Sequence, residues 1–214
     1  RFKCDWSSDV CSSDLYAAVM GPIAELLAAK TSPQPSTGLA LLVITPLRAL
    51  SRDLALAIEE PIQAMGWPLQ VAIRNGDTSS HERSKQLRRP PEILITTPES
   101  LSLLLANPKA PQLFGALQAV VLDEWHELMG SKRGVQVQLA LARLRRWNPD
   151  LVVWGLSATM GNLREARHVL LGTWSDEAKG VLVEGDLKKQ IVVDCLIPEN
   201  VSRFPWGGHL GLQM

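Results

Sequence analysis

Two adjacent acids and a histidine follow an apolar run near the middle of this 214-residue chain. Asp123 and Glu124 come directly after residues 118–122 (QAVVL), and His126 lies two residues further on, in the string DEWH. An acid at the end of a buried strand can hold Mg²⁺ through bound water, and a second carboxylate can orient and deprotonate an attacking water. Acids at strand ends also begin helices, so DEWH alone leaves both interpretations open.

Polar residues follow other apolar runs in the same way. The runs LALLVIT, EILI and LVVWGL lead into Pro46, into Thr96-Thr97-Pro98-Glu99 and into Ser157-Ala158-Thr159, respectively. The carboxyl ends of parallel strands meet at one edge of a sheet, and open α/β sheets bind their ligands along that edge. Acids and hydroxyls gathered there indicate a site for a metal and phosphates.

Apolar runs alternate with helical patterns along the chain. Strands are expected at residues 39–45, 69–74, 92–95, 118–122 and 151–156, and helices at 17–30, 48–65, 81–88, 98–105, 135–147 and 163–171. The continuous apolar character of several runs is typical of strands buried on both faces. The alternation predicts a three-layer α/β domain with a mainly parallel sheet.

Composition excludes several classes of protein. The chain is 46% hydrophobic and 21% charged, and its 22 basic residues balance its 22 acidic residues. These values exclude a disordered chain and bulk electrostatic binding of nucleic acid, although a local basic patch can still bind it. No apolar run reaches the length of a membrane span, and three cysteines form neither a disulfide framework nor a zinc spacing. We expect a reduced, cytoplasmic protein.

The first fifteen residues differ from the rest. Residues 5–15 (DWSSDVCSSDL) are the translation of a common sequencing-adapter oligonucleotide, and residues 1–15 show neither periodicity nor a signal-peptide core. We interpret them as an artefact, in preference to a disordered polar arm, and set Cys4 and Cys11 aside with them. The authentic chain then starts near Tyr16.

The order of the motifs resembles a known enzyme family. TPLRAL (45–50), Thr97-Pro98-Glu99, DEWH and Ser157-Ala158-Thr159 follow the order of motifs Ia, Ib, II and III of the superfamily 2 DEXH-box helicases. RNGDTSSHER, VVLDEWHELMGSKRG and FPWGGHLGL resemble the large helicase-related (Lhr-like) branch, with the ligase-associated DEXH-box DNA helicases most similar. The resemblance covers nearly all of residues 17–214 and implies a RecA-like (P-loop NTPase) domain.

The resemblance implies a role for each motif. By analogy with the family, Asp123 coordinates Mg²⁺ through water and Glu124 activates the attacking water. His126, Ser157 and Thr159 would couple ATP hydrolysis to DNA movement. The residues that would hold a single strand by its phosphates are Arg48, Gly76, Thr97 and Ser100. Contacts to phosphates position the strand and carry no base specificity.

The chain departs from the family at both ends. The Gly-rich phosphate loop of the family is absent, and the adapter-like segment stands where that loop and its strand are expected. We therefore expect three regions: residues 1–15 as artefact, 16–175 as a RecA-like ATP-binding domain incomplete at its N-terminus, and 176–214 as a β-rich connection toward a missing second RecA-like domain.

Other notable residues have less specific interpretations. The basic residues Arg143, Arg145 and Arg146 are read as a solvated helix face, and the tryptophans Trp67, Trp147 and Trp154 as packing residues. Trp125 is read as tolerated packing within DEWH, and Cys195 as a buried, inert thiol. For Lys132, Arg133 and Gly134 in SKRG, a DNA-facing role and simple helix initiation both remain open.

These observations leave three functional hypotheses. The first is a fragment of an ATP-dependent DNA helicase or translocase acting in DNA repair, with ATP and Mg²⁺ as cofactors and single-stranded or partly duplex DNA as partner. The second is a catalytically inactive nucleic-acid-binding fragment, since the loop that grips the phosphates is missing. The third keeps the enzyme and makes RNA its substrate. A DNA ligase or nuclease encoded nearby is a further expected partner, and no membrane is expected.

Overall fold

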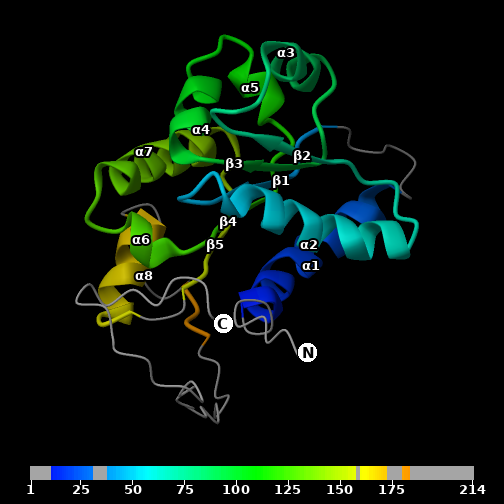
Figure 1. Cartoon of the computed structure of the whole chain (residues 1–214). Helices are drawn as coiled ribbons and strands as arrows, with labels where there is room; N and C mark the ends of the chain where they lie inside the picture. The colour runs from blue at the N-terminus through cyan, green and yellow to red at the C-terminus, as the bar shows by residue number, and fades with distance from the viewer. Residues whose placement is uncertain (1–10, 31–37, 158–159, 173–179, 184–214) are drawn as a thin grey trace, which may run out of the picture. The chain divides into compact units, whose positions relative to one another are not determined.

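A parallel sheet forms the centre of the domain. The computed structural model describes residues 11–30, 38–157, 160–172 and 180–183. The strands in this part of the chain are β1 (Leu41–Ile44), β2 (Val71–Arg74), β3 (Ile93–Thr96), β4 (Ala119–Leu122) and β5 (Val152–Gly155). They lie in the order β2-β3-β1-β4-β5, and every neighbouring pair is parallel (Figure 1). The predicted parallel α/β sheet is confirmed.

Helices connect the strands. They are α1 (Cys11–Lys30), α2 (Leu50–Ala64), α3 (Ser80–Arg88), α4 (Pro98–Leu105), α5 (Ala110–Leu113), α6 (Trp125–Leu128), α7 (Lys132–Trp147) and α8 (Leu163–Leu171). The sequence predicts all of these except α5 and α6. Those two helices have four residues each, which is too short for an amphipathic period to be recognised.

The two faces of the sheet bury alternate residues of each strand. Leu41 and Val43 of β1 pack in the same cluster as the buried side chains of α1 and α2. Leu42 and Ile44 point to the other face, where they join side chains from α4, α5, α6, α7 and α8. This alternation is the period of a pleated strand, and it produces the three layers expected.

Strand β5 forms where the sequence predicts a strand, but its side chains are more exposed than those of β1, β3 and β4. The side chains of Val152 and Trp154 are 51% and 37% exposed, while Val153 packs against the cluster that contains α7 and α8. These side chains are exposed because β5 is the last strand in the order and pairs only with β4 among the described residues. An apolar run does not reveal whether its strand is central or at an edge.

The first helix crosses the boundary predicted at residue 15. It begins at Cys11 and continues without a break to Lys30, and Leu15 is buried in the same cluster as Ala18. The separate origin of residues 1–15 stays a prediction. The predicted connection at 176–214, including Cys195, lies outside the described residues except for 180–183.

Candidate functional site

The ends of the strands lie in register at one edge of the sheet. Ile44 pairs with Thr96 on one side and with Leu122 on the other, and Leu122 pairs with Gly155. Hydrogen bonds continue one residue beyond the strands, since the amide of Asp123 donates to the carbonyl of Ile44 at 2.9 Å. The polar residues that follow β1, β3, β4 and β5 therefore meet at this edge, as the sequence indicates.

Strand order divides these residues into two groups. The acids follow β4, and Ser157 lies just beyond β5. The residues predicted to hold a nucleic-acid strand follow β1, β2 and β3, which lie next to one another on the side of β4 opposite to β5. The edge thus has an acidic half and a half that carries Arg48 and hydroxyl groups.

Asp123 is the more buried acid of the pair. It is 7% exposed and begins the turn between β4 and α6. Burial raises the pKa of Asp123 to about 6, and the negative charge of Glu124 adds to the rise. The carboxyl group is therefore largely ionised at neutral pH but protonated under mildly acidic conditions.

Glu124 has an uncommon backbone conformation. Its φ of 46° and ψ of 50° lie in the left-handed region, and among the described non-glycine residues only Glu124 has a positive φ. A side chain in this region brings Cβ close to the following carbonyl, at a cost of about 1–2 kcal/mol. Such strained residues cluster at functional sites, where the surrounding contacts hold them in place.

His126 connects the acidic turn to the end of β5. Its Nδ1 lies 2.9 Å from Oγ of Ser157 and 3.3 Å from Oε2 of Glu124. Its Nε2 lies 3.6 Å from Oε1 of Glu127. The structure thus brings together Glu124, His126 and Ser157, three residues singled out from the sequence, whereas Thr159 lies outside the described residues.

Trp125 has a larger part in this turn than the sequence suggests. It is 2% exposed, its backbone amide donates to the carbonyl of Leu156 at 2.8 Å, and its indole Nε1 donates to the carbonyl of Ala166 in α8 at 3.2 Å. The reading of Trp125 as merely tolerated packing is therefore incomplete. The residue type itself could have indicated this role, because the N–H of a buried indole requires a hydrogen-bond acceptor.

Arg48 and Gly76 lie close together on the other half of the edge. A Cβ atom at Gly76 would lie 2.8 Å from Cζ of Arg48, so a larger residue here would displace the flexible, exposed guanidinium from its present position. Nη1 of Arg48 also lies 3.3 Å from Oδ1 of Asp77, and both side chains are more than 60% exposed. The guanidinium is accessible to a phosphate from solvent.

Thr97 and Ser100 form a second pair at the start of α4. The hydroxyl of Thr97 donates to that of Ser100 at 3.3 Å, and the two residues are 3% and 8% exposed. Pro98 lies at the first position of the helix, where its missing N–H costs nothing. The two residues are placed together as the sequence suggests, but they present much less surface than Arg48.

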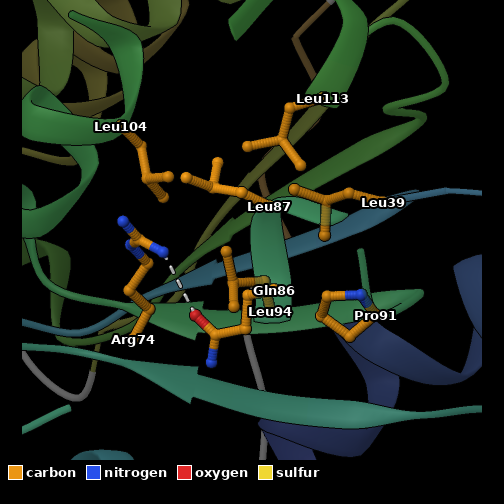
Figure 2. A pocket seen from close by; sticks show the side chains of 8 residues that line it. All are labelled: Leu39, Arg74, Gln86, Leu87, Pro91, Leu94, Leu104 and Leu113. Carbon is orange, nitrogen blue, oxygen red and sulfur yellow. Dashed lines mark hydrogen bonds between the residues drawn. The ribbon is translucent and has the colours of Figure 1, made fainter. Parts of the chain in front are cut away.

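The small pocket in Figure 2 has none of these residues in its lining. It is lined by Leu39, Arg74, Gln86, Leu87, Pro91, Leu94, Leu104 and Leu113. Nη1 of Arg74 lies 3.3 Å from Oε1 of Gln86, and burial, followed by the charge of Arg83, lowers the pKa of Arg74. This lining contains no residue predicted to act in chemistry, so the pocket is a packing feature between the sheet and its helices.

The described residues lack two other kinds of feature. They contain no cluster of three His, Cys, Asp or Glu side chains that could form a metal cage. None of the helices in that same part of the chain has both the length and the apolar character needed to cross a membrane.

A parallel sheet with polar groups gathered at its carboxyl edge, enclosed between two helical layers, defines this chain as a RecA-like domain. The chain belongs to the DEAD/DEAH box helicase family, whose model matches residues 17–166. The predicted resemblance to DEXH-box helicases is confirmed.

Curated relatives carry the Lhr name. An ATP-dependent helicase Lhr-Core from Methanothermobacter thermautotrophicus is 35% identical over 202 residues, which cover 90% of this chain and 23% of the relative. The Lhr helicase/uracil glycosylase of Escherichia coli is 40% identical over 114 residues, covering 49% of this chain and 7% of that protein. The chain thus spans about a quarter or less of these relatives.

Solved structures agree on the fold. The helicase Lhr of Mycobacterium smegmatis, bound to single-stranded DNA and AMP-PNP, matches 76% of this chain and 24% of its own at 29% identity and a TM-score of 0.56. The DEAD-box helicase Mss116, bound to single-stranded RNA and UDP-BeF, matches 73% of this chain and 32% of its own with a TM-score of 0.63. At 14% identity, Mss116 supports the fold alone.

Proposed function

We propose that this chain is the first RecA-like domain of an ATP-dependent DNA helicase or translocase of the Lhr-like branch. The observation that carries the proposal is the contact of His126 with both Glu124 and Ser157, which joins the acidic turn to the end of the neighbouring strand. It supports a path from the site of hydrolysis to the segment that follows β5. The Lhr helicase that matches this chain was solved with single-stranded DNA and AMP-PNP, which supports DNA and ATP as ligands.

The donor groups at the acidic half suit Mg²⁺ held mainly by water and phosphate. This ion usually binds through one or two carboxylates and keeps several waters, so the carboxylate of Asp123 is sufficient. When bound with ATP, the ion would neutralise charge that develops on the phosphates. Asp123 would hold the ion through water, and the carboxylate of Glu124 would orient a water and accept its proton.

The other half of the edge would hold the strand. The exposed guanidinium of Arg48 would bind a phosphate, and the loop at Gly76 and the hydroxyls of Thr97 and Ser100 would line the same path. Binding of this kind positions the strand without reading its bases. DNA is favoured over RNA by the likeness to Lhr, since contacts to phosphates distinguish the two sugars poorly.

The remaining expectations depend on a longer protein. A second RecA-like domain would complete the ATP site and the strand path, and a DNA ligase or nuclease would act on the same DNA during repair. The curated relatives named above come from an archaeon and a bacterium, whose ATP and DNA are cytoplasmic, and on that basis we place the activity in the cytoplasm.

The decisive experiment compares two glutamates of the same turn in the longer protein. Glu124→Gln should keep binding of Mg·ATP and lose about 10²–10⁴-fold in turnover, the usual contribution of a general base. Glu127→Gln is the matched control, because Glu127 is the exposed neighbour on the other side of His126, and it should hydrolyse ATP at the parent rate. ATP turnover is measured with and without a deoxythymidine oligomer and, in parallel, a uridine oligomer.

The same assay separates the alternatives. If Glu124→Gln hydrolyses ATP at the parent rate, Glu124 is not the general base of the reaction. Strand binding without any turnover in the unmodified protein would instead favour a catalytically inactive nucleic-acid-binding protein. Stimulation by the uridine oligomer alone would make RNA the substrate.

A further inference from the structure

Arg133 contacts two strand-end loops from a third element. It is the second residue of α7, and its Nε donates to Oε1 of Glu99 at 2.6 Å. Its Nη1 donates to the carbonyl oxygen of Pro46 at 3.2 Å. Pro46 follows β1 and precedes Arg48 by two residues, while Glu99 lies in the first turn of α4. One guanidinium therefore joins the loops that carry the proposed strand-binding residues.

The start of α7 holds Arg133 in a fixed place. The hydroxyl of Ser131 accepts a hydrogen bond from the amide of Gly134 at 3.2 Å and donates to the carbonyl of Leu128 at 2.7 Å. A Cβ atom at Gly134 would lie only 2.1 Å from the carbonyl oxygen of Leu128, so any larger residue would force the backbone at this helix start to shift. The string SKRG thus does initiate a helix, and the helix start orients the guanidinium.

The contacts of Arg133 suit a bridge better than a direct phosphate contact. Arginine presents several donors in a rigid planar fork, and its bonds to a carboxylate are among the stronger hydrogen bonds in proteins. Burial acts to raise the pKa of Glu99, but its backbone hydrogen bond and the Arg133 guanidinium hold that pKa below its ordinary value. The ionised Glu99 offsets the positive charge of Arg133, which weakens any direct attraction to a phosphate.

We infer that Arg133 is a positioning residue of the nucleic-acid site, which sets the spacing between the Arg48 loop and the Thr97–Ser100 turn. This inference rests on the proposed function, because it assumes that these two loops bind the strand. With the bridge intact, both loops are held before the strand arrives. Without the bridge, binding of the strand must also order the two loops, and the affinity for the strand falls because of that entropic cost.

Substitution of Glu99 distinguishes a bridge from simple electrostatics, because the two predict changes of opposite sign in the affinity for the strand. Glu99→Ala removes a negative charge from the surface, so simple electrostatics predicts tighter binding of an anionic strand. Loss of the bridge predicts weaker binding instead. We expect about 5–10-fold weaker binding for Glu99→Ala and for Arg133→Gln, and no further loss when the two are combined, because both remove the same bridge. Arg133→Lys should recover only part of the affinity.

The measurement is fluorescence anisotropy of a labelled deoxythymidine oligomer titrated with the 214-residue chain at several salt concentrations. The slope of log K against log salt is negative, and losing one phosphate contact reduces its magnitude by about 0.7 for a single strand. Arg133→Gln should lower affinity with this slope unchanged. Arg146→Gln is the control for charge, because Arg146 is an exposed arginine in the last turn of the same helix, and its affinity should change less than twofold.

The outcomes separate this inference from the proposed function. If Arg48→Ala weakens binding while Glu99→Ala leaves it unchanged or tightens it, the bridge is not a positioning device, although the strand site stands. If Arg48→Ala itself leaves binding unchanged, the proposed strand site is wrong and the inference fails with it. Thermal unfolding of each variant checks the fold, and if Arg133→Gln fails to fold, the sign observed for Glu99→Ala decides alone.

Discussion

Asp123 should make the folded domain less stable as the pH rises through the mildly acidic range. Its ordinary pKa is 3.8, and burial together with the charge of Glu124 raises it to about 6 in the folded state. The folded state therefore binds the proton more tightly than the unfolded chain does. The contribution of Asp123 to stability is fully present below pH 3.8 and is lost as the pH rises to about 6.

The size of the effect follows from the two pKa values. The gap of about two pH units corresponds to about 3 kcal/mol at 1.36 kcal/mol per unit. Asp123→Asn removes the titrating group and keeps nearly the same shape. The variant should therefore match the parent near pH 4 and exceed its free energy of unfolding by on the order of 3 kcal/mol at pH 7.

The assay is urea unfolding of the 214-residue chain and its variants at intervals between pH 4 and 8. Asp53→Asn is the control for the change of an aspartate to asparagine itself, because Asp53 lies exposed in the first turn of α2. The reasoning is refuted if Asp123→Asn shows the same pH dependence as the parent. It is also refuted if the variant becomes less stable relative to the parent as the pH rises.

Four further substitutions test the turn between β4 and α6, the start of α7 and the open side of α1 by urea unfolding. Gly134→Ala should cost about 1–3 kcal/mol, because its Cβ would overlap the carbonyl of Leu128. Gly21→Ala, on the open side of α1, should instead gain about 0.5–1 kcal/mol, and equal effects at the two glycines would contradict the packing described. Glu124→Gly should raise stability by up to about 1 kcal/mol, because relief of the left-handed strain exceeds the entropy cost of glycine; a less stable variant would show that the strain is absent. Trp125→Phe should lose about 0.5–1.5 kcal/mol with its hydrogen bond to Ala166, and an unchanged midpoint would mean that the bond contributes nothing.

The elements of the fold could be predicted well from the order of residues alone. The apolar runs at 41–44, 93–96 and 119–122 are buried on both faces, which leaves a continuous signal that needs no partner to be recognised. Residues that follow such runs must meet at the carboxyl edge of a parallel sheet. For this reason Asp123, Ser157 and Thr97 could be assigned to one edge from the sequence.

Tertiary structure alone decided how those residues are arranged. The order of the strands depends on long-range pairing, so neither the exposure of Trp154 on an edge strand nor the division of the edge into two halves follows from local pattern. The left-handed backbone of Glu124 arises because the chain must turn sharply between β4 and α6. The bridge from Arg133 joins residues 34 and 87 positions away, and no periodicity encodes such a contact. Local residue patterns determined which elements form, because burial and helix geometry act over a few residues. Only the folded chain determined which side chains meet, because those contacts join segments that sequence spacing leaves unrelated.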